Sequence, residues 1–253
     1  MKKRLLSALL ALLALPALVS AQRGGGAQQS GRPGAIKDLT GYWVSVVSEH
    51  WHVRMMVPPK GDTEMLPVNA EARRITNAWD PAKDEGAGEA CRSYGAPTLM
   101  RVPGRLHITW QDDNTLKIDA DSGTQTRLLH FGAGEAGRAG AGQAPSWQGY
   151  SVANWRRPAR AEAKKDAGDL RVVTTKLRPG YLRKNGVPYS ENTTVEEYYD
   201  LFMEPNGDTW LVIDTIITDP TYLTQPYVNS VAFKKERDGA KWDPTRCRAD
   251  QPR

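Results

Sequence analysis

Hydrophobic and polar side chains alternate along most of the chain after residue 100, in runs separated by turn residues. Alternation with a period of two is typical of strands that bury one face. Asp112-Asp113-Asn114 and Pro205-Asn206-Gly207-Asp208 indicate two hairpin turns between such runs. The strands predicted in this way are Leu106–Gln111, Thr115–Asp119, Thr124–Phe131, Gly149–Trp155, Leu170–Leu177, Thr193–Met203, Thr209–Thr218 and Val228–Lys235.

An earlier β-type run opens at Asp38 and continues through Val57, where Pro58-Pro59 stops it. The pattern then changes between Pro67 and Asp80. Asn69 is placed to cap a short helix, and Asp80-Pro81 is placed to end it. We therefore expect one short helix near the N-terminus, between the first and second strands.

About nine strands, joined mostly in sequence order, favour an all-β, closed up-and-down barrel over a sandwich. Closure also removes exposed strand edges. Two stretches interrupt the rhythm: residues 132–145 are rich in Gly and Ala, and residues 156–168 are charged and rich in Ala. Strand patterns resume on either side of both, so we expect two long loop insertions within one domain.

The N-terminus has the pattern of a secretory leader. Lys2, Lys3 and Arg4 precede an apolar run from Leu5 to Val19, and small residues follow at Ser20 and Ala21. We expect residues 1–21 to be a signal peptide, residues 22–37 a disordered segment and residues 38–253 a single barrel domain. The apolar run is short for a spanning helix, so we expect a periplasmic or secreted protein without stable membrane insertion.

The formal charge of +5 falls to +2 when Lys2, Lys3 and Arg4 leave with the leader. The remaining basic residues are scattered, which argues against nucleic-acid binding, because that requires clustered cations. Only two cysteines are present, Cys91 and Cys247. An even count in an oxidising compartment favours a disulfide between them over two free thiols.

The opening Leu39-Thr40-Gly41-Tyr42-Trp43 resembles the start of the first strand in lipocalins and their calycin relatives. This resemblance implies that Trp43 fills the base of the barrel. It also implies that a basic residue from the last strand, such as Lys234 or Lys235, lies against its ring. The stretches 100–110 and 178–190 are similar to a group of uncharacterised secreted proteins of Gram-negative bacteria. That second resemblance implies a periplasmic or secreted location and assigns no catalytic residue.

One parity of every strand in a barrel points inward, so some polar groups of the middle strands would line a cavity. The mixed strand 193–203 carries Glu196 and Tyr198 on one face, and Arg127 is a natural partner for a buried carboxylate. His107 or Glu196 is a candidate general base. The alternative is ordinary alternation, with apolar side chains inside and these polar groups in water.

Residues 178–190 form a loop that is rich in cationic and aromatic side chains. Pro179-Gly180 and Asn185-Gly186 mark two turns. As a lid at the barrel mouth, the loop would present cations and aromatic rings to an anionic or phenolic ligand. The alternative is a surface hairpin with solvated charges. The candidate ligand-binding residues are Arg127, Arg178, Tyr181, Arg183, Tyr189 and Tyr198.

His50 and His52 lie two apart and would share a face of a strand, with His107 or His130 as a third ligand. No acidic or Cys residue has a diagnostic spacing with them, so we predict no metal site. The chain has no nucleophile elbow, phosphate loop, dinucleotide fingerprint or haem-attachment motif. We therefore expect no cofactor.

The patterns favour a lipocalin-like protein that binds a small, largely apolar ligand in the barrel, with an aromatic ring or an anionic end on that ligand. One alternative is an enzyme on the same barrel that uses acid–base chemistry on a small hydrophobic or aromatic substrate. A third is an interaction module that binds another envelope protein through its loops. The patterns define no oligomeric state.

Overall fold

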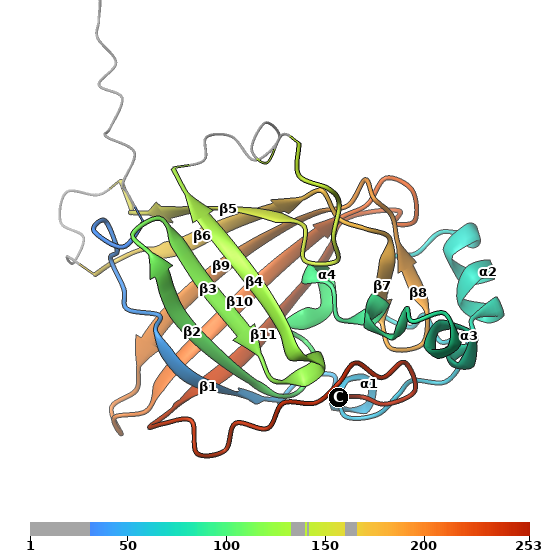
Figure 1. The fold of residues 1–253 in the computed structure, drawn as a ribbon, viewed down its shortest axis with the longest axis horizontal. Helices are drawn as coiled ribbons and strands as arrows, with labels where there is room; N and C mark the ends of the chain where they lie inside the picture. The colour runs from blue at the N-terminus through green and yellow to red at the C-terminus, as the bar shows by residue number, and fades with distance from the viewer. Residues whose placement is uncertain (1–30, 133–139, 141, 160–165) are drawn as a thin grey trace, which may run out of the picture.

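The computed structural model describes residues 31–132, 140, 142–159 and 166–253. The predicted leader and parts of both predicted insertions lie outside these residues. Within them, nine strands close into a barrel with the spatial order β1-β11-β10-β9-β6-β5-β4-β3-β2 (Figure 1). The barrel strands are β1 Gly41–Val46, β2 Arg105–Asp112, β3 Thr115–Ala120, β4 Gln125–Phe131, β5 Tyr150–Arg156, β6 Asp169–Thr175, β9 Thr194–Met203, β10 Thr209–Thr218 and β11 Tyr227–Glu236.

The barrel is not purely up-and-down, as the sequence had suggested, because β4 and β5 are parallel. The other neighbouring strands pair antiparallel. Parallel neighbours require a crossover of a dozen or more residues, and the chain from residue 132 to residue 149 provides that length. This link lets the start of β5 pair in parallel with the end of β4, with Leu129 opposite Ser151 and Phe131 opposite Ala153.

The inward parity of the strands is mostly apolar and packs into one core. Trp43 on β1 is fully buried, and its indole Nε1 donates to the Leu39 carbonyl at 3.0 Å. The Lys235 ammonium lies 5.3 Å from the centre of the Trp43 ring. Of these two contacts, the resemblance implied only the second, a basic side chain against the Trp43 ring.

A cap of short helices and one hairpin covers the other end of the barrel, at the right of Figure 1. It has its own apolar core, in which Leu66, Leu182 and Val187 pack together. The elements of the cap are α1 Trp51–Arg54, α2 Ala70–Ala78, α3 Pro81–Gly86, the 3₁₀ helix η1 Ala90–Ser93, α4 Ala96–Leu99, and the strands β7 Gly180–Arg183 and β8 Val187–Tyr189. A second 3₁₀ turn, η2, spans Ser122–Thr124 between β3 and β4.

The one helix predicted from the sequence is present in the cap, but the cap contains more helices than predicted. Asn69 caps α2 as predicted, because its side chain accepts a hydrogen bond from the Ala72 amide at 3.0 Å. Asp80 does not only end that helix; its side chain caps α3, which begins at Pro81. Four α-helices therefore stand in the described residues where one was expected, because three are short and lack a readable apolar period.

The long first strand predicted through Val57 is also wrong. β1 ends at Val46, and the chain turns into α1 after His50, whose backbone φ of 49° lies in the left-handed region. Arg54 is drawn inward, where its Nε donates to the Arg101 carbonyl at 2.9 Å. Trp51 and Met55 are exposed, so the alternation in this run does not correspond to a buried strand face.

Both ends of the described chain are attached to the barrel or its cap. The Arg32 amide donates to the Asp113 carbonyl at 2.8 Å, and the Gly31 carbonyl accepts a hydrogen bond from the Trp155 indole at 3.1 Å. The predicted disulfide is confirmed: Cys91 in η1 is bonded to Cys247 in the C-terminal segment. This segment passes along the capped end of the barrel (Figure 1).

Candidate functional site

The structure places the candidate residues in three separate regions. One is the barrel interior, the second is the outer surface of the barrel, and the third is the cap. The residues are Arg127 in the interior, His107, Glu196 and Tyr198 on the outer surface, and Arg178, Tyr181, Arg183 and Tyr189 in the cap.

Arg127 lies at the centre of the barrel and is paired with Glu197, a residue that sequence reasoning did not select. Both side chains are fully buried, and two parallel hydrogen bonds of 2.9 and 2.6 Å join the guanidinium to the carboxylate. Burial is the largest effect on the pKa of Arg127 and lowers it, but the Glu197 charge, the Tyr199 charge and the hydrogen bonds to both together raise the pKa above its usual value. The Arg127 guanidinium therefore stays charged inside the barrel.

The remaining polar groups beside this pair are also mostly satisfied. Arg127 Nη2 donates to the Thr174 hydroxyl at 3.2 Å, and that hydroxyl contacts the Ser151 hydroxyl at 2.8 Å. Burial, followed by the Glu197 charge, raises the pKa of Tyr199. Large buried side chains such as Trp43 and Phe233 fill the interior around this network. The centre of the barrel is thus a packed core with an ion pair.

The two candidate bases face outward, on strands far apart in the barrel order. The His107 ring stacks on Tyr42, with ring centres 4.1 Å apart. Glu196 accepts hydrogen bonds from Arg171 and Tyr198, and the Arg171 bond is the main cause that lowers the pKa of Glu196. Within the described residues, the structure does not bring His107, Glu196 and Arg127 to one cavity, so the cluster that the sequence suggested for acid–base chemistry is not formed.

Residues 178–190, expected as a lid or a surface hairpin, form a hairpin built into the cap. Tyr181, Arg183 and Tyr189 are all buried in it. Burial raises the pKa of Tyr189. Arg178 is the exception: it is half-exposed, forms an ion pair with Glu89 and lies with its guanidinium 4.6 Å from the centre of the Trp147 ring. The two turns therefore place most of the segment inside the cap rather than over an open mouth.

A pocket of about 300 Å³ opens between α2, α3, η1 and β7. We call it the aromatic pocket, because the Trp79 and Tyr181 rings meet edge to face there, with centres 6.4 Å apart. The Arg92 guanidinium lies 4.6 Å from the centre of the Tyr181 ring. The full lining is Arg74, Ile75, Ala78, Trp79, Asp80, Lys83, Asp84, Arg92 and Tyr181.

Asp84 organises the polar side of the aromatic pocket. Its carboxylate accepts hydrogen bonds from the Trp79 indole at 2.8 Å, and from Arg92 and the Tyr181 hydroxyl at 3.3 Å each. Burial is the main cause that raises the pKa of Tyr181, so its hydroxyl stays protonated. Arg92 retains a buried Nε without a partner in the described residues. The pocket thus combines aromatic walls with the Arg92–Asp84 ion pair.

Gly186 allows the hairpin turn to approach this pocket. Its φ of +81° is a conformation that residues with a side chain rarely adopt, and a Cβ there would come within 2.1 Å of the Trp79 ring. The Asn185-Gly186 signal in the sequence therefore marks the turn that packs against Trp79. The spacing of Trp79, Asp84 and Arg92 gave no such signal, because three different elements bring them together.

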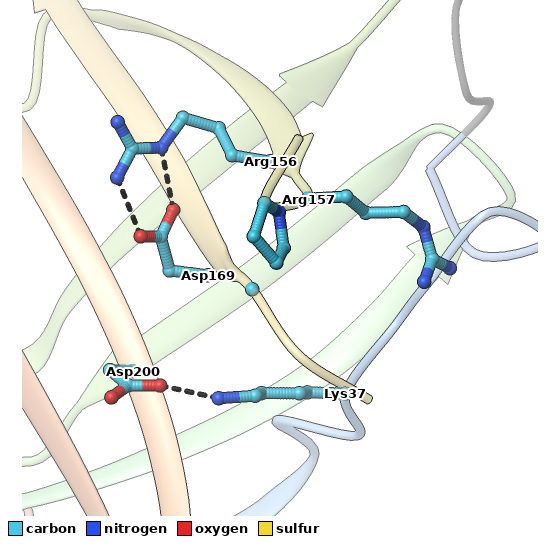
Figure 2. Close-up of a pocket in the computed structure, with 7 residues that line it drawn as sticks. Lys37, Arg156, Arg157, Asp169 and Asp200 are labelled. Atoms are coloured by element: carbon cyan, nitrogen blue, oxygen red, sulfur yellow. Dashed lines mark hydrogen bonds and ion pairs between the residues drawn. The ribbon is translucent and has the colours of Figure 1, made fainter. Parts of the chain in front are cut away.

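A larger pocket, of about 610 Å³, lies at the barrel surface and is lined by charged residues. Figure 2 shows that Arg156 faces Asp169 and that Lys37 points at Asp200. The Arg156–Asp169 pair is joined by hydrogen bonds of 2.7 and 2.5 Å. Most of the charged side chains that line this larger pocket are thus paired with one another. Pro158 is the main apolar residue in the lining, so the pocket lacks the apolar walls of a small-molecule site.

The histidines do not meet in the structure. His50 precedes α1 and His52 lies within it, while the His130 ring stacks on Tyr150 with centres 4.6 Å apart. In the described part of the chain, no three His, Cys, Asp or Glu side chains are placed to hold a metal ion. The same part contains no helix long and apolar enough to cross a membrane.

No protein-family model, curated protein or solved structure matches this chain. The lipocalin resemblance therefore depends on the chain's own residues. What the structure supports of it is a closed, nine-stranded β-barrel in the described residues.

Proposed function

We propose that this protein binds a small, largely apolar ligand with an aromatic ring and an anionic end, and that the ligand occupies the aromatic pocket. One observation carries the proposal. Trp79 and Tyr181 meet the Arg92–Asp84 pair around about 300 Å³ of space. Ligand sites combine apolar or aromatic walls with a few placed polar groups, and this is the pocket that best meets that description.

The position of the proposed site differs from the sequence-based expectation. The sequence favoured a ligand inside the barrel. The barrel centre is packed, however, and opening it would expose the Arg127–Glu197 ion pair and its apolar neighbours. The aromatic pocket already has open space, and Tyr181 belongs to both the expected and the proposed site.

The proposed compartment is the periplasm or the outside of the cell. The leader-like residues 1–21 support it, and so does the Cys91–Cys247 disulfide, because such bonds persist in oxidising compartments. A lipocalin-like ancestry for the barrel is part of the same proposal. Its support is the Gly41-Tyr42-Trp43 opening together with the buried Trp43 under Lys235.

The test is binding of 1-anilinonaphthalene-8-sulfonate, an aromatic anion, to the mature chain, measured by its fluorescence. We expect saturable binding to the parent protein. Trp79→Leu should weaken it about tenfold or more, because a stacking wall is lost. Arg92→Gln should weaken it as well, because Arg92 supplies a cation at the wall of the pocket.

Trp51→Leu is the matched control, since Trp51 is also in the cap but is 61% exposed and does not line the aromatic pocket. It should bind the dye as the parent does. Melting curves of all three variants establish that they are folded. Folded Trp79→Leu and Arg92→Gln variants with parental affinity would show that the ligand binds elsewhere. Native mass spectrometry of the purified protein then identifies any small molecule that copurifies.

A further inference from the structure

Four cations line a second pocket at the capped end of the barrel, which we call the cation pocket. Arg54 ends α1, Arg101 follows α4, and Arg183 and Lys184 lie at the end of β7. Their exposed fractions are 4, 8, 5 and 6%, in that order. Burying a cation is unfavourable unless it is paired, so four at one place require an explanation.

The three guanidinium groups have unused donors. Arg54 Nη2, Arg101 Nη1 and Arg183 Nη1 are buried and have no hydrogen-bond partner among the described residues. Arg101 is the extreme case: its guanidinium makes no hydrogen bond or ion pair within the described chain, and its nearest aromatic contact is the Tyr227 ring, 5.8 Å away. Three donors from three distant parts of the sequence thus line one pocket.

The charges of the cation pocket do not balance. Glu49 forms an ion pair with Arg54, and the Asp62 carboxylate lies 3.8 Å from Arg183 Nη1. Both carboxylates are partly exposed. Lys184 forms no ion pair within the described residues; its ammonium donates to the Arg248 carbonyl at 3.3 Å. The Lys184 ammonium lies over the Tyr94 ring, and the charges that act on it are those of Asp250 and Glu85, so it is balanced separately. The three guanidinium groups against Glu49 and Asp62 leave an excess of one positive charge.

The pKa values of neighbouring groups are consistent with an unfavourable excess of positive charge in the cation pocket. Burial is the largest cause that lowers the pKa of both Arg54 and Arg183, and Arg101 adds to the lowering in each case. His50 lies beside the cluster, and its pKa is lowered by burial and then by Arg101. These like charges repel one another, so a bound anion would stabilise the folded protein.

We propose that the cation pocket binds a phosphate group in its dianionic form, either as free phosphate or as the end of a phosphate monoester. The negative charge of such a group offsets the excess positive charge of the three guanidinium groups. Three unused guanidinium donors match the three terminal oxygens of such a group, whereas a carboxylate offers only two oxygens.

The shape of the pocket restricts the ligand to a small group. Its free space is about 20 Å³, bounded by apolar side chains that include Val53, Val102 and Leu182. Pro252, the last residue but one, forms another wall. A phosphate is larger than this space, so it enters by moving the C-terminal residues, which belong to no barrel strand. This movement loosens the contact of Arg253 with Asp121, while the rest of a monoester stays outside.

The experiment is isothermal titration of the mature protein, in phosphate-free buffer, with inorganic phosphate, glycerol phosphate and acetate. We expect one phosphate to bind per chain and acetate not to bind. Arg101→Met should weaken phosphate binding about tenfold to a hundredfold, because charged hydrogen bonds are lost. Arg237→Met is the control, since Arg237 is 95% exposed, and it should bind phosphate like the parent. Comparable binding of glycerol phosphate would identify monoesters as ligands, and its absence would identify free phosphate.

Melting temperature gives a second and independent readout. Without phosphate, Arg101→Met should melt above the parent, because it removes a buried cation that forms no ion pair within the described residues. Arg183→Met should melt below the parent, because it also removes the contact with Asp62 and the hydrogen bond to the Glu64 carbonyl. Phosphate should raise the melting temperature of the parent and leave both variants unchanged. Lower melting temperatures in both variants, together with a parent that ignores phosphate, would show that the cations are structural and overturn the proposal. Acetate binding as tightly as phosphate would overturn the ligand class.

The phosphate-binding experiment and the dye-binding experiment test separate sites. The two pockets share no lining residue. Loss of dye binding in Trp79→Leu with intact phosphate binding, or the reverse, would therefore decide one proposal without touching the other.

Discussion

Lys184 shows at the residue scale how the cap holds charge away from water. Its ammonium lies 3.4 Å from the centre of the Tyr94 ring and donates to the Arg248 carbonyl. Burial lowers the pKa of Lys184 to about 7, against smaller opposing effects of Asp250 and Glu85. The charged form is therefore less favourable in the folded protein than in the unfolded chain.

The lowered pKa of Lys184 predicts how the free energy of unfolding changes with pH. Between about pH 7 and 10.5, the folded protein binds fewer protons at Lys184 than the unfolded chain does, so the free energy of unfolding rises with pH in this window. Lys184→Met should remove that rise and stabilise the protein at pH 6 by a few kcal/mol at most, an order-of-magnitude figure from the pKa shift. Urea unfolding at pH 6 and pH 9 in phosphate-free buffer measures it. The exposed Lys241→Met serves as the control, and parallel pH profiles for parent and Lys184→Met would contradict the prediction.

At the scale of elements, the barrel is joined across its interior as well as around its wall. β4 and β9 are not neighbours, since β5 and β6 separate them in the sheet. Arg127 on β4 and Glu197 on β9 nevertheless form two hydrogen bonds inside the barrel. Desolvation offsets much of the attraction within a buried ion pair, so the pair adds little to the free energy of unfolding. Its main effect is to specify which strands face each other across the barrel.

A double-mutant cycle tests this cross-barrel link. Glu197→Leu should destabilise the protein by about 3–5 kcal/mol, because it leaves the Arg127 charge buried without a partner. Arg127→Met should also destabilise it. The double variant should lose much less than the sum of the two single losses, because no unpaired charge remains. Chemical denaturation gives all four free energies, and additive losses would mean that the two side chains act independently.

At the scale of the whole molecule, the C-terminal segment fastens the cap to the barrel. The disulfide joins Cys247 to η1 across a sequence separation of 156 residues. Arg253 then donates to Asp121, a fully buried carboxylate at the end of β3, at 2.8 Å. The last residues of the chain thus connect parts of the molecule that the strand order alone leaves separate.

Removing the disulfide should therefore destabilise the whole molecule. The chain-entropy model gives about 5 kcal/mol for a loop of this length. The Cys91→Ala/Cys247→Ala variant should unfold at a lower urea concentration than the oxidised parent, and a reductant should shift the parent and leave the variant unchanged. Thiol labelling of the denatured, unreduced parent checks the premise. Two reactive thiols there would mean that the bond is not formed in the isolated protein.

The sequence by itself determined the local structure of this protein. Alternation located the eight later strands to within one or two residues, because each buries one face and a period of two has no other common cause. It also determined the α2 cap at Asn69 and the pairing of the two cysteines. Where alternation arose in an exposed run, as between residues 47 and 57, the same reasoning predicted a strand that is absent.

Only the tertiary structure decided which polar groups meet. Arg127 was selected without its partner, because Glu197 lies on a strand three places away in the sheet. Arg183 was selected as part of a lid, and the fold instead buries it beside Arg54 and Arg101. The aromatic pocket is likewise assembled from three helices and a hairpin. Periodicity reports the face that one segment buries, whereas a site depends on side chains that chain closure brings together from distant segments.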